Sequence, residues 1–223
     1  MAFSKRIKKL ASLVDSNAFV IDVGCDHGLL DIYLTLYNNN KCLACDINEN
    51  ALNSAKENIK KYNLDIETKL SNGLNDIDVK EHSTCVIAGM GTNLILSILS
   101  NNKINKIDSL IIQTNNDYEE LRKNVSKLGF YIEDEIAFKD KKIWYIIMKL
   151  KRGTKKYKKK EYILGPVLLK KKDKETIEYF KCEHDKYCKI LKSIPKRYIF
   201  KRMKVKYILG HLSNYIKKVG PSL

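Results

Sequence analysis

Short apolar runs alternate with helical segments through the first 150 residues, and this alternation constrains the fold more than any other feature of the chain. Apolar runs of this kind, followed by polar turn residues, are typical of buried strands. Between them, apolar side chains recur every three or four residues, which predicts helices. Strands are predicted at 19–23, 42–45, 66–70, 84–88, 109–113, 130–138 and 143–150, and helices at 3–14, 29–37, 49–62, 92–99 and 118–128. We expect Asn48 to cap one helix and Gly129 to end another. The pattern predicts an α/β fold with an open, doubly wound, mostly parallel sheet and helices on both faces.

Charge is unevenly distributed along the chain. Residues 1–150 contain 19 Lys and Arg against 20 Asp and Glu, whereas residues 151–223 contain 23 against 6. A basic block beside a neutral domain indicates binding to a polyanion, because each Lys or Arg that contacts a phosphate releases a counterion. The alternative is a Lys-rich solvated face produced by biased composition, which would be expected to affect both parts equally.

The C-terminal part is predicted to form a helical arm. Residues 151–160 contain seven Lys or Arg and are interpreted as a linker or a mobile basic segment. Gly165-Pro166 marks a helix start, and apolar stripes predict helices over 167–191 and 198–215, separated at Pro195. Two such helices would pack on each other as a short antiparallel coiled coil. The chain is therefore divided into a domain at 1–150 and an arm at 151–223.

The six cysteines do not suggest a disulfide framework. Cys42 and Cys45 form a C-x-x-C pair inside a predicted buried strand, and Cys182 and Cys188 lie on a helical pattern. Zinc or redox chemistry stays open as a less favoured alternative, and no metal is predicted. The N-terminus lacks the apolar core of a signal peptide, and no apolar run approaches the ~18 residues of a membrane span. We expect a cytoplasmic protein.

The loop after the first strand, Asp22-Val-Gly-Cys-Asp-His-Gly28, has the composition of a ligand-binding turn. In doubly wound sheets, ligands bind beyond the carboxyl ends of the strands. Gly24 allows close approach of a ligand to the backbone, and Asp46 ends the second strand, where its carboxylate can accept hydrogen bonds from two ribose hydroxyls. The dinucleotide fingerprint G-x-G-x-x-G is broken, which disfavours a dehydrogenase, and no Walker A motif is present. The combination favours S-adenosylmethionine as the cofactor.

The same loop resembles the first motif of the bacterial tRNA N1-adenine methyltransferases that act at position 22, the TrmK family. Three later stretches resemble that family's motifs in the same order: Asn72-Gly-Leu74, Ala88-Gly-Met-Gly91 and Gln113-Thr-Asn115. The similarity extends from Arg6 to the helical arm. It implies a Rossmann-like class I methyltransferase fold with a C-terminal coiled-coil arm, and tRNA as the substrate and partner. No protein partner is inferred. The implied cofactor-binding residues are Asp22, Gly24, Asp46, Ile47, Asn72, Gly73, Ala88, Gly89 and Met90.

Three residues depart from the pattern of the family. Asn72 stands in place of Asp, so a hydrogen bond to the adenine edge of the cofactor would be retained without charge. Thr92 replaces a second Gly after Met90, and Thr114 replaces a Pro in the Gln113-Thr-Asn115 stretch. These departures leave the position specificity open.

Adenine N1 carries an in-plane lone pair that can attack a sulfonium methyl directly. Attack gives a cationic base, so the enzyme must align the reactants and stabilise positive charge. Asp26 and Asn115 are the candidates for holding the base edge, with Asp26 also stabilising the charge. His27 is a candidate for orienting the loop or contacting the substrate, and a helix-start residue bonded to backbone is an equally open interpretation. Gly89 and Gly91 would leave room for a flipped base.

The basic residues are predicted to grip the RNA backbone, which RNA-binding proteins recognise mainly by shape and phosphate contacts. The candidates are Arg6, Lys155, Lys156, Lys158, Lys159, Lys160, Arg197, Lys201 and Arg202. Two alternatives to a tRNA methyltransferase remain open at this point. One is a methyltransferase of another nucleic acid, and the other is an RNA-binding protein whose methyltransferase-like domain does not catalyse.

Overall fold

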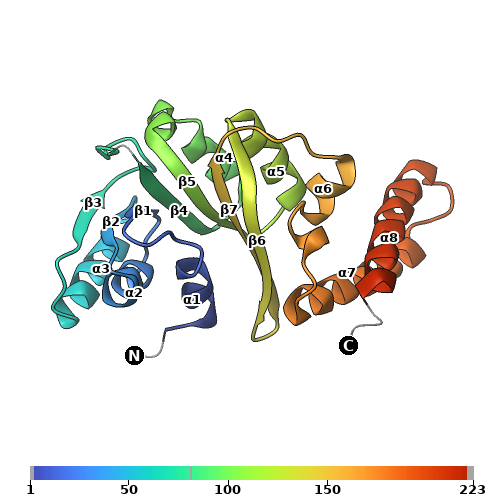
Figure 1. Cartoon of the computed structure of the whole chain (residues 1–223), viewed down its shortest axis with the longest axis horizontal. Helices are drawn as coiled ribbons and strands as arrows, with labels where there is room; N and C mark the ends of the chain where they lie inside the picture. The colour runs from blue at the N-terminus through green and yellow to red at the C-terminus, as the bar shows by residue number, and fades with distance from the viewer. Residues whose placement is uncertain (1–2, 81, 220–223) are drawn as a thin grey trace. The chain divides into compact units, whose positions relative to one another are not determined.

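The computed structural model describes residues 3–80 and 82–219, which form two compact units. The first comprises the chain up to Asp134 together with Ile147–Lys155, and the second comprises Glu135–Ile146 together with the chain from Lys156 onward (Figure 1). The hairpin segment 135–146, which the sequence analysis assigned to the N-terminal domain, is thus grouped with the C-terminal helices. The predicted domain limits at Met1 and Leu223 lie outside the described residues.

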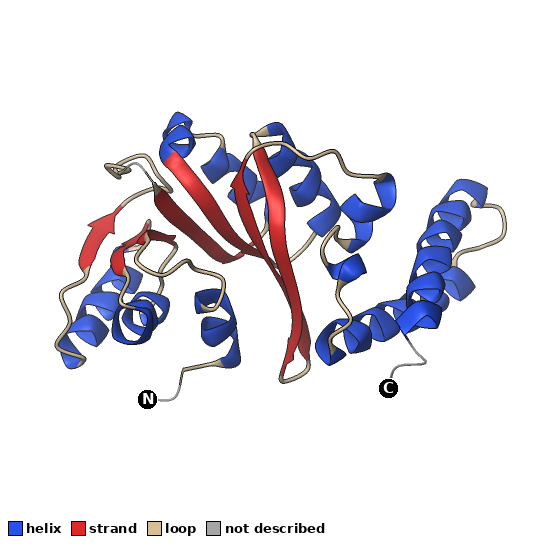
Figure 2. Cartoon of the chain, in the orientation of Figure 1, coloured by secondary structure: helices blue, strands red, loops and turns tan. Residues whose placement is uncertain are grey.

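A seven-stranded sheet organises the first unit, and two of its strands continue into the second (Figure 2). Its strand order is β3-β2-β1-β4-β5-β7-β6. The pairs among β1 to β5 are parallel, and β7 runs antiparallel to β5. The strands are β1 (Phe19–Val23), β2 (Lys41–Asp46), β3 (Glu67–Leu70), β4 (Ser83–Met90), β5 (Ile107–Thr114), β6 (Phe130–Asp140) and β7 (Ile143–Arg152). The predicted doubly wound, mostly parallel sheet is confirmed, and the strand order reverses at β1 and β4, where such folds bind ligands.

Helices cover both faces of this sheet (Figure 1). One layer contains α1, α2 and α3, which contact one another in sequence, and the other contains α4 and α5. Asn48 caps α3 as predicted, because its side chain accepts a hydrogen bond from the Asn50 N–H at 2.9 Å. The bounds are α1 (Lys5–Ala11), α2 (Leu29–Asn38), α3 (Glu49–Lys61), α4 (Thr92–Leu99), the 3₁₀ helix η1 (Asn102–Lys106) and α5 (Tyr118–Lys127).

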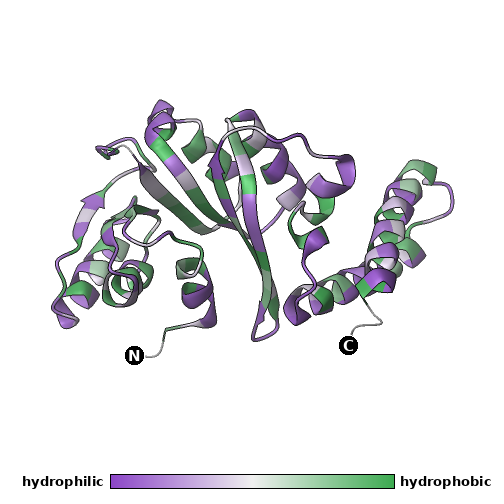
Figure 3. Ribbon diagram, in the orientation of Figure 1, coloured by the Kyte–Doolittle hydropathy of each residue, from purple (hydrophilic) through white to green (hydrophobic). Residues whose placement is uncertain are grey.

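The central strands are buried on both sides, which explains their continuous apolar sequence. Ile21, Val86 and Ile111 are each inaccessible to solvent. In Figure 3 these strands are predominantly green, whereas the exposed helix surfaces carry more purple. A core of this kind places the polar residues at strand ends rather than within strands, and the functional loops follow those ends.

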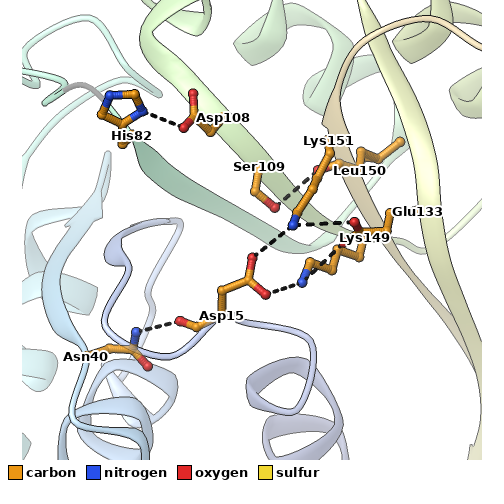
Figure 4. Close-up of polar contacts among 9 residues, drawn as sticks. All are labelled: Asp15, Asn40, His82, Asp108, Ser109, Glu133, Lys149, Leu150 and Lys151. Carbon is orange, nitrogen blue, oxygen red and sulfur yellow. Dashed lines mark hydrogen bonds and ion pairs between the residues drawn. The ribbon is translucent and has the colours of Figure 1, made fainter.

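An ion-pair network ties the segment after α1 to the strands β6 and β7 (Figure 4). Lys149 Nζ lies 2.5 Å from Asp15 Oδ1 and 3.3 Å from Glu133 Oε2. Lys151 contacts the same two carboxylates at 3.6 and 3.4 Å. Burial alone would raise the pKa of Asp15, but hydrogen bonding and attraction to the two lysines lower it overall. The network compensates the cost of burying the Lys149 ammonium.

The second unit contains α6 (Lys159–Leu164), η2 (Leu168–Lys170), α7 (Lys174–Ser193) and α8 (Ile199–Val219). Helices α7 and α8 pack along each other, and the rings of Phe180 and Tyr215 meet at 4.5 Å between their centroids. The predicted linker at 151–160 is shorter than expected, because β7 runs to Arg152 and α6 begins at Lys159, with residues 153–158 between them. The predicted helix start at Gly165-Pro166 was wrong, since Gly165 ends α6.

The predicted helix at 167–191 begins later than expected because Asp173 acts as the N-cap of α7. Its carboxylate accepts a hydrogen bond from the Thr176 N–H at 2.9 Å. Upstream, the buried Glu135 carboxylate accepts hydrogen bonds from the N–H groups of Val167 and Leu168, which fixes a separate turn there. A membrane-crossing helix, which would need a long uninterrupted apolar stretch, is absent from the described residues.

Candidate active site

The loop that follows β1 requires glycine at two positions. Gly24 has a φ of +80° and Gly28 a φ of +65°, a region that side-chain-bearing residues rarely adopt. A Cβ on Gly24 would come within 2.2 Å of Met90 Cε. The Gly24 and Cys25 N–H groups both donate to the Cys45 carbonyl, at 2.8 and 3.0 Å. The loop is therefore held tightly against the end of β2, and the predicted close approach of a ligand to Gly24 stays a prediction.

Asp46 links two loops through one carboxylate. Its Oδ2 accepts a hydrogen bond from the Asp26 N–H at 3.1 Å, and its Oδ1 accepts one from the Asn48 N–H at 2.8 Å. A carboxylate oxygen can accept a second hydrogen bond, so the predicted contact with ribose hydroxyls is compatible with these bonds. The side chain thus orders the Asp26 turn before any ligand is present.

A cavity of about 350 Å³ lies beyond the carboxyl ends of β1 to β4. Eight of the nine predicted cofactor-binding residues line it: Gly24, Asp46, Ile47, Asn72, Gly73, Ala88, Gly89 and Met90. The predicted catalytic residue Asp26 also lines it, as do Leu94 and Ile98, which the sequence analysis missed because their spacing on α4 is ordinary for core. A volume of this order suits a nucleoside-sized ligand.

Asp22, the ninth predicted residue, lines a smaller adjoining cavity of about 90 Å³. This cavity shares Gly24, Asp26 and Ala88 with the larger one and is also lined by His27. The two cavities therefore form neighbouring parts of one site, and the loop after β1 is common to both.

A buried pair of carboxyls lies beneath this loop. Asp22 is 5% exposed and Asp31, on α2, is fully buried. Neither oxygen of Asp31 receives a hydrogen bond from a donor group in the described chain. Burial, with a contribution from Asp46, raises the pKa of Asp22 to about 7, and burial together with repulsion from Asp22 raises the pKa of Asp31 well above its usual range. Asp31 was not predicted as a site residue, since a lone Asp inside a helical pattern carries no motif.

The candidate base-holding residue Asn115 belongs to a chain of hydrogen bonds. Arg6 Nη1 donates to Gln113 Oε1 at 3.4 Å, Gln113 Nε2 donates to Asn115 Oδ1 at 3.1 Å, and Asn115 Nδ2 donates to the Gly89 carbonyl at 2.7 Å. These bonds fix the side-chain amide of Asn115 beside the cavity-lining Gly89. Arg6 itself lines both cavities, which places it in the candidate site, and its contact with RNA stays a prediction.

Asp26 and His27 are exposed at the entrance of the site. Their side chains are 73% and 56% exposed, with His27 Nε2 at 3.7 Å from Asp26 Oδ1. Asp26 adopts a left-handed backbone with a φ of +51°. The His27 carbonyl accepts a hydrogen bond from Asn58 Nδ2 at 3.0 Å, which anchors the backbone of this loop to α3. Both side chains are free to turn toward a substrate.

The predicted RNA-binding residues other than Arg6 differ in what they contact. Lys155 Nζ lies 3.9 Å from the Tyr131 ring centroid, and Lys159 Nζ lies 5.4 Å from that of Tyr207. Arg202 is already engaged, because its Nη1 donates to the carbonyls of Leu191 and Ile194 at 3.0 and 2.6 Å. Lys160 is half-buried, and exposed side chains are found at Lys155, Lys156, Lys158, Lys159, Arg197 and Lys201.

The cysteine pair that left zinc or redox chemistry open is buried within β2. Cys42 and Cys45 are free thiols, and burial raises the pKa of each. In the part of the chain that the structure describes, no group of three or more His, Cys, Asp or Glu residues is placed to hold a metal ion. The pair therefore packs as small core residues.

Known proteins resemble the chain over most of its length. A family model described as TrmK, tRNA (adenine(22)-N(1))-methyltransferase, matches residues 20–216. The Mycoplasma genitalium protein MG248, named as a tRNA methyltransferase, is 34% identical over 186 residues, which is 80% of this chain and 84% of that protein. The tRNA (adenine(22)-N(1))-methyltransferase of Bacillus subtilis is 28% identical over 160 residues, covering 70% of this chain and 67% of that enzyme.

A solved structure extends the likeness to the fold and the cofactor. The structure of M. capricolum TrmK in complex with the cofactor product S-adenosyl-homocysteine is 27% identical, with a TM-score of 0.83, and covers 98% of this chain and all of that one. The Rossmann-like methyltransferase fold predicted from the sequence is confirmed by this match. The chain belongs to the TrmK family of tRNA (adenine(22)-N(1))-methyltransferases.

Proposed function

We propose that this chain transfers the methyl group of S-adenosylmethionine to N1 of adenine 22 in tRNA, with the loops after β1, β2, β3 and β4 holding the cofactor. One observation carries the proposal. Eight of the nine cofactor-binding residues that the family motifs nominate come from the ends of four strands and the loops after them, and these eight line one cavity in a chain that the TrmK family model matches almost throughout. The same donor set argues against a dinucleotide, since the loop after β1 lacks the glycines that cradle a pyrophosphate.

When bound, S-adenosylmethionine supplies a methyl group attached to a positively charged sulfur. The N1 lone pair can attack the methyl carbon in line, with the sulfur as the leaving group. The N1–C bond forms as the C–S bond breaks, and the products are S-adenosylhomocysteine and a cationic 1-methyladenine. The residues of the chain do not need to remove a proton before attack. Their task is to align the two reactants and to stabilise the charge that moves onto the base.

The residues divide this task according to their positions. Asp46 and Asn72 offer acceptors toward the nucleoside part of the cofactor, and the buried Asp22 offers a carboxylate toward its ammonium group. Asp26, exposed at the entrance, is placed to stabilise the cationic base, with His27 beside it at 3.7 Å. Asn115 holds the base edge, and Arg6 acts as a positioning residue because it contacts Asn115 only through Gln113.

The arm from residue 151 onward supplies the grip on tRNA in this proposal. The exposed lysines between Lys155 and Lys159, with Arg197 on the α7–α8 turn and Lys201 at the start of α8, offer phosphate contacts that carry no sequence information. The six free cysteines suit a reducing cytoplasm, where tRNA is modified.

The direct test is methyl transfer from radiolabelled S-adenosylmethionine to an unmodified transcript of a tRNA with adenine at position 22, followed by nucleoside analysis. We expect 1-methyladenosine, and no product with a transcript that has guanosine at position 22. Tight tRNA binding without transfer would favour the alternative of a binding protein that does not catalyse. Transfer to the guanosine-22 transcript at the same rate would contradict the assigned position.

A further inference from the structure

The start of α8 presents an apolar stripe to solvent. Phe200 is 88% exposed and Met203 is 59% exposed, with Tyr207 one turn further at 39%. Residues at these spacings share one face of a helix. The face that packs inside the second unit is the opposite one, where Val205, Ile208 and Leu212 are buried. In Figure 3 the end of α8 next to the α7–α8 turn is correspondingly green.

Cations surround this stripe at both ends. Arg197 Cζ and Lys201 Nζ lie 5.1 and 5.3 Å from the Tyr198 ring centroid at the turn, and Lys159 Nζ lies 5.4 Å from that of Tyr207. By helical spacing, Lys204 and Lys206 lie on either side of the stripe. Residues 186–223 contain 11 Lys and Arg and no Asp or Glu. The apolar stripe is thus enclosed by positive charge.

This combination selects among possible occupants. A second copy of the same face would bring two sets of cations together, which is unfavourable at short range. A double-helical RNA offers phosphates but keeps its bases stacked inside. Unpaired RNA offers phosphates together with exposed base faces, which aromatic side chains bind by stacking.

We propose that Phe200, Met203 and Tyr207 form a stacking site for unpaired nucleobases of the RNA substrate, with the flanking cations holding the adjoining phosphates. The proposal rests on the proposed function in that it takes the RNA to be tRNA, whose loops supply unpaired bases. It assigns to the start of α8 a recognition of unpaired nucleotides, in addition to the phosphate contacts of the arm.

The test compares Phe200→Ala with wild type in full-length protein, by fluorescence anisotropy with labelled tRNA transcript and without cofactor. Loss of one stacked base should raise Kd about 5- to 150-fold. The slope of log Kd against log salt should stay unchanged, because no charge is removed. Ile143→Ala is the matched control, since Ile143 is 58% exposed and lies outside the arm's helices. Its Kd should match that of wild type.

Two further probes identify the occupant. Binding to a fully paired RNA duplex should be insensitive to Phe200→Ala, and an equal loss on the duplex would overturn the stacking assignment. The wild-type chain has one Trp, Trp144. The tryptophan fluorescence of Phe200→Trp, after subtraction of the wild-type signal, therefore reports the environment of position 200 in the stripe. We expect that emission to be quenched by single-stranded oligonucleotide and little changed by duplex.

The remaining outcomes are also informative. An unchanged tRNA Kd in Phe200→Ala would overturn the proposal, as would binding to anionic phosphatidylglycerol vesicles that depends on Phe200 while RNA binding does not. Because the measurement is one of binding without cofactor, its result is separate from that of methyl transfer. A protein that stacks RNA but fails to methylate would contradict only the proposed function.

Discussion

The hydroxyl oxygens of Thr92 and Thr114 lie 2.9 Å apart, and both residues are buried. Thr92 Oγ1 also bonds to the Asn116 carbonyl at 2.7 Å, and Thr114 Oγ1 donates toward the Met90 carbonyl at 3.2 Å. These are two of the three positions at which the chain departs from the family motifs. The departures are therefore in direct contact, and their hydroxyls join the start of α4 to the end of β5.

This contact predicts that the two threonines are energetically coupled. Thr92→Val and Thr114→Val each leave buried acceptors without a donor, so each should reduce the free energy of unfolding by about 1–3 kcal/mol. The double variant should lose less than the sum, with a coupling energy on the order of 0.5–3 kcal/mol. Urea denaturation of the three variants and the wild type measures the cycle.

The same variants test whether the contact positions Asn115, which lies between Thr114 and Asn116. We expect kcat for methyl transfer to fall in the single variants, with little change in the Kd for S-adenosylmethionine. Ser54→Ala is a suitable control, because its hydroxyl bonds to an exposed carbonyl of its own helix, that of Asn50, at 3.0 Å. Strict additivity of the two stability losses would show that the hydroxyls act independently.

The sequence predicted the sheet and most of the candidate site because both depend on local signals. Buried parallel strands are continuous apolar runs, and strand ends such as Asp22 and Asp46 are marked by an abrupt change to polar residues. The antiparallel direction of β7 and the strand order follow from tertiary packing, which periodicity does not encode.

The missed features involve residues whose partners are distant in sequence. Asp31 looks like an ordinary polar residue within a helix until α2 buries it next to Asp22. Arg6 was grouped with the RNA-binding cations because charge alone does not reveal its hydrogen bond to Gln113, 107 positions later. Arg202 was grouped in the same way, although it caps the carbonyl end of α7.

Gly24 is predicted to be essential for cofactor binding. In Gly24→Ala, the Cβ would collide with Met90 Cε, and a φ of +80° costs an L-residue about 1–2 kcal/mol. We expect the Kd for S-adenosylmethionine to rise at least about tenfold, which corresponds to ~1.4 kcal/mol. Isothermal titration calorimetry provides the measurement.

Gly210→Ala is the matched control for this variant. Gly210 lies inside α8, and among the described residues no atom other than the neighbouring helix backbone and its two chain neighbours comes within 4 Å of the added Cβ. Replacing a helical Gly with Ala should stabilise the protein by about 0.5–1 kcal/mol and leave cofactor binding unchanged. Cofactor affinity equal to wild type in Gly24→Ala would remove this loop from the cofactor site.

The basic segment before and within α6 should set the salt dependence of tRNA binding. Replacing Lys155, Lys156, Lys158, Lys159 and Lys160 with Gln should reduce the slope of log Kd against log salt by up to ~0.7–0.9 for each phosphate that the protein no longer neutralises. Arg202→Gln should behave differently, because Arg202 bonds to the carbonyls of Leu191 and Ile194. It should lower stability by about 1–3 kcal/mol. An unaltered slope in the lysine variant would identify the segment as a solvated connection.

The aspartates with shifted pKa values predict opposite pH effects, because the pKa of Asp31 is raised and that of Asp15 is lowered. The folded-state pKa of Asp31, like that of Asp22, is raised, so the folded protein retains protons that the unfolded chain releases above its ordinary pKa of 3.8. The contribution of Asp22 and Asp31 to stability is fully present below pH 3.8. It is lost as pH rises toward about 7, the folded-state pKa of Asp22. The folded-state pKa of Asp15 is lowered, so its contribution is present above 3.8 and is lost only as pH falls below it.

Asp31→Asn removes one buried carboxyl whose pKa is raised by burial and by repulsion from Asp22, while Asp46 and Arg6 continue to act on Asp22. Relative to wild type, this variant should gain stability steadily between about pH 5 and pH 7, by up to ~1.4 kcal/mol per pH unit for each proton no longer taken up on folding. Asp15→Asn should instead show a small and constant loss over the same range, about 0.5–1 kcal/mol, because only one ion-pair partner of Lys149 is removed. Urea denaturation without cofactor at several pH values measures both variants. A stability difference between Asp31→Asn and wild type that does not change with pH would show that Asp31 is ionised in the folded protein, and it would contradict the shared burial of these two acids as the cause of their raised pKa values.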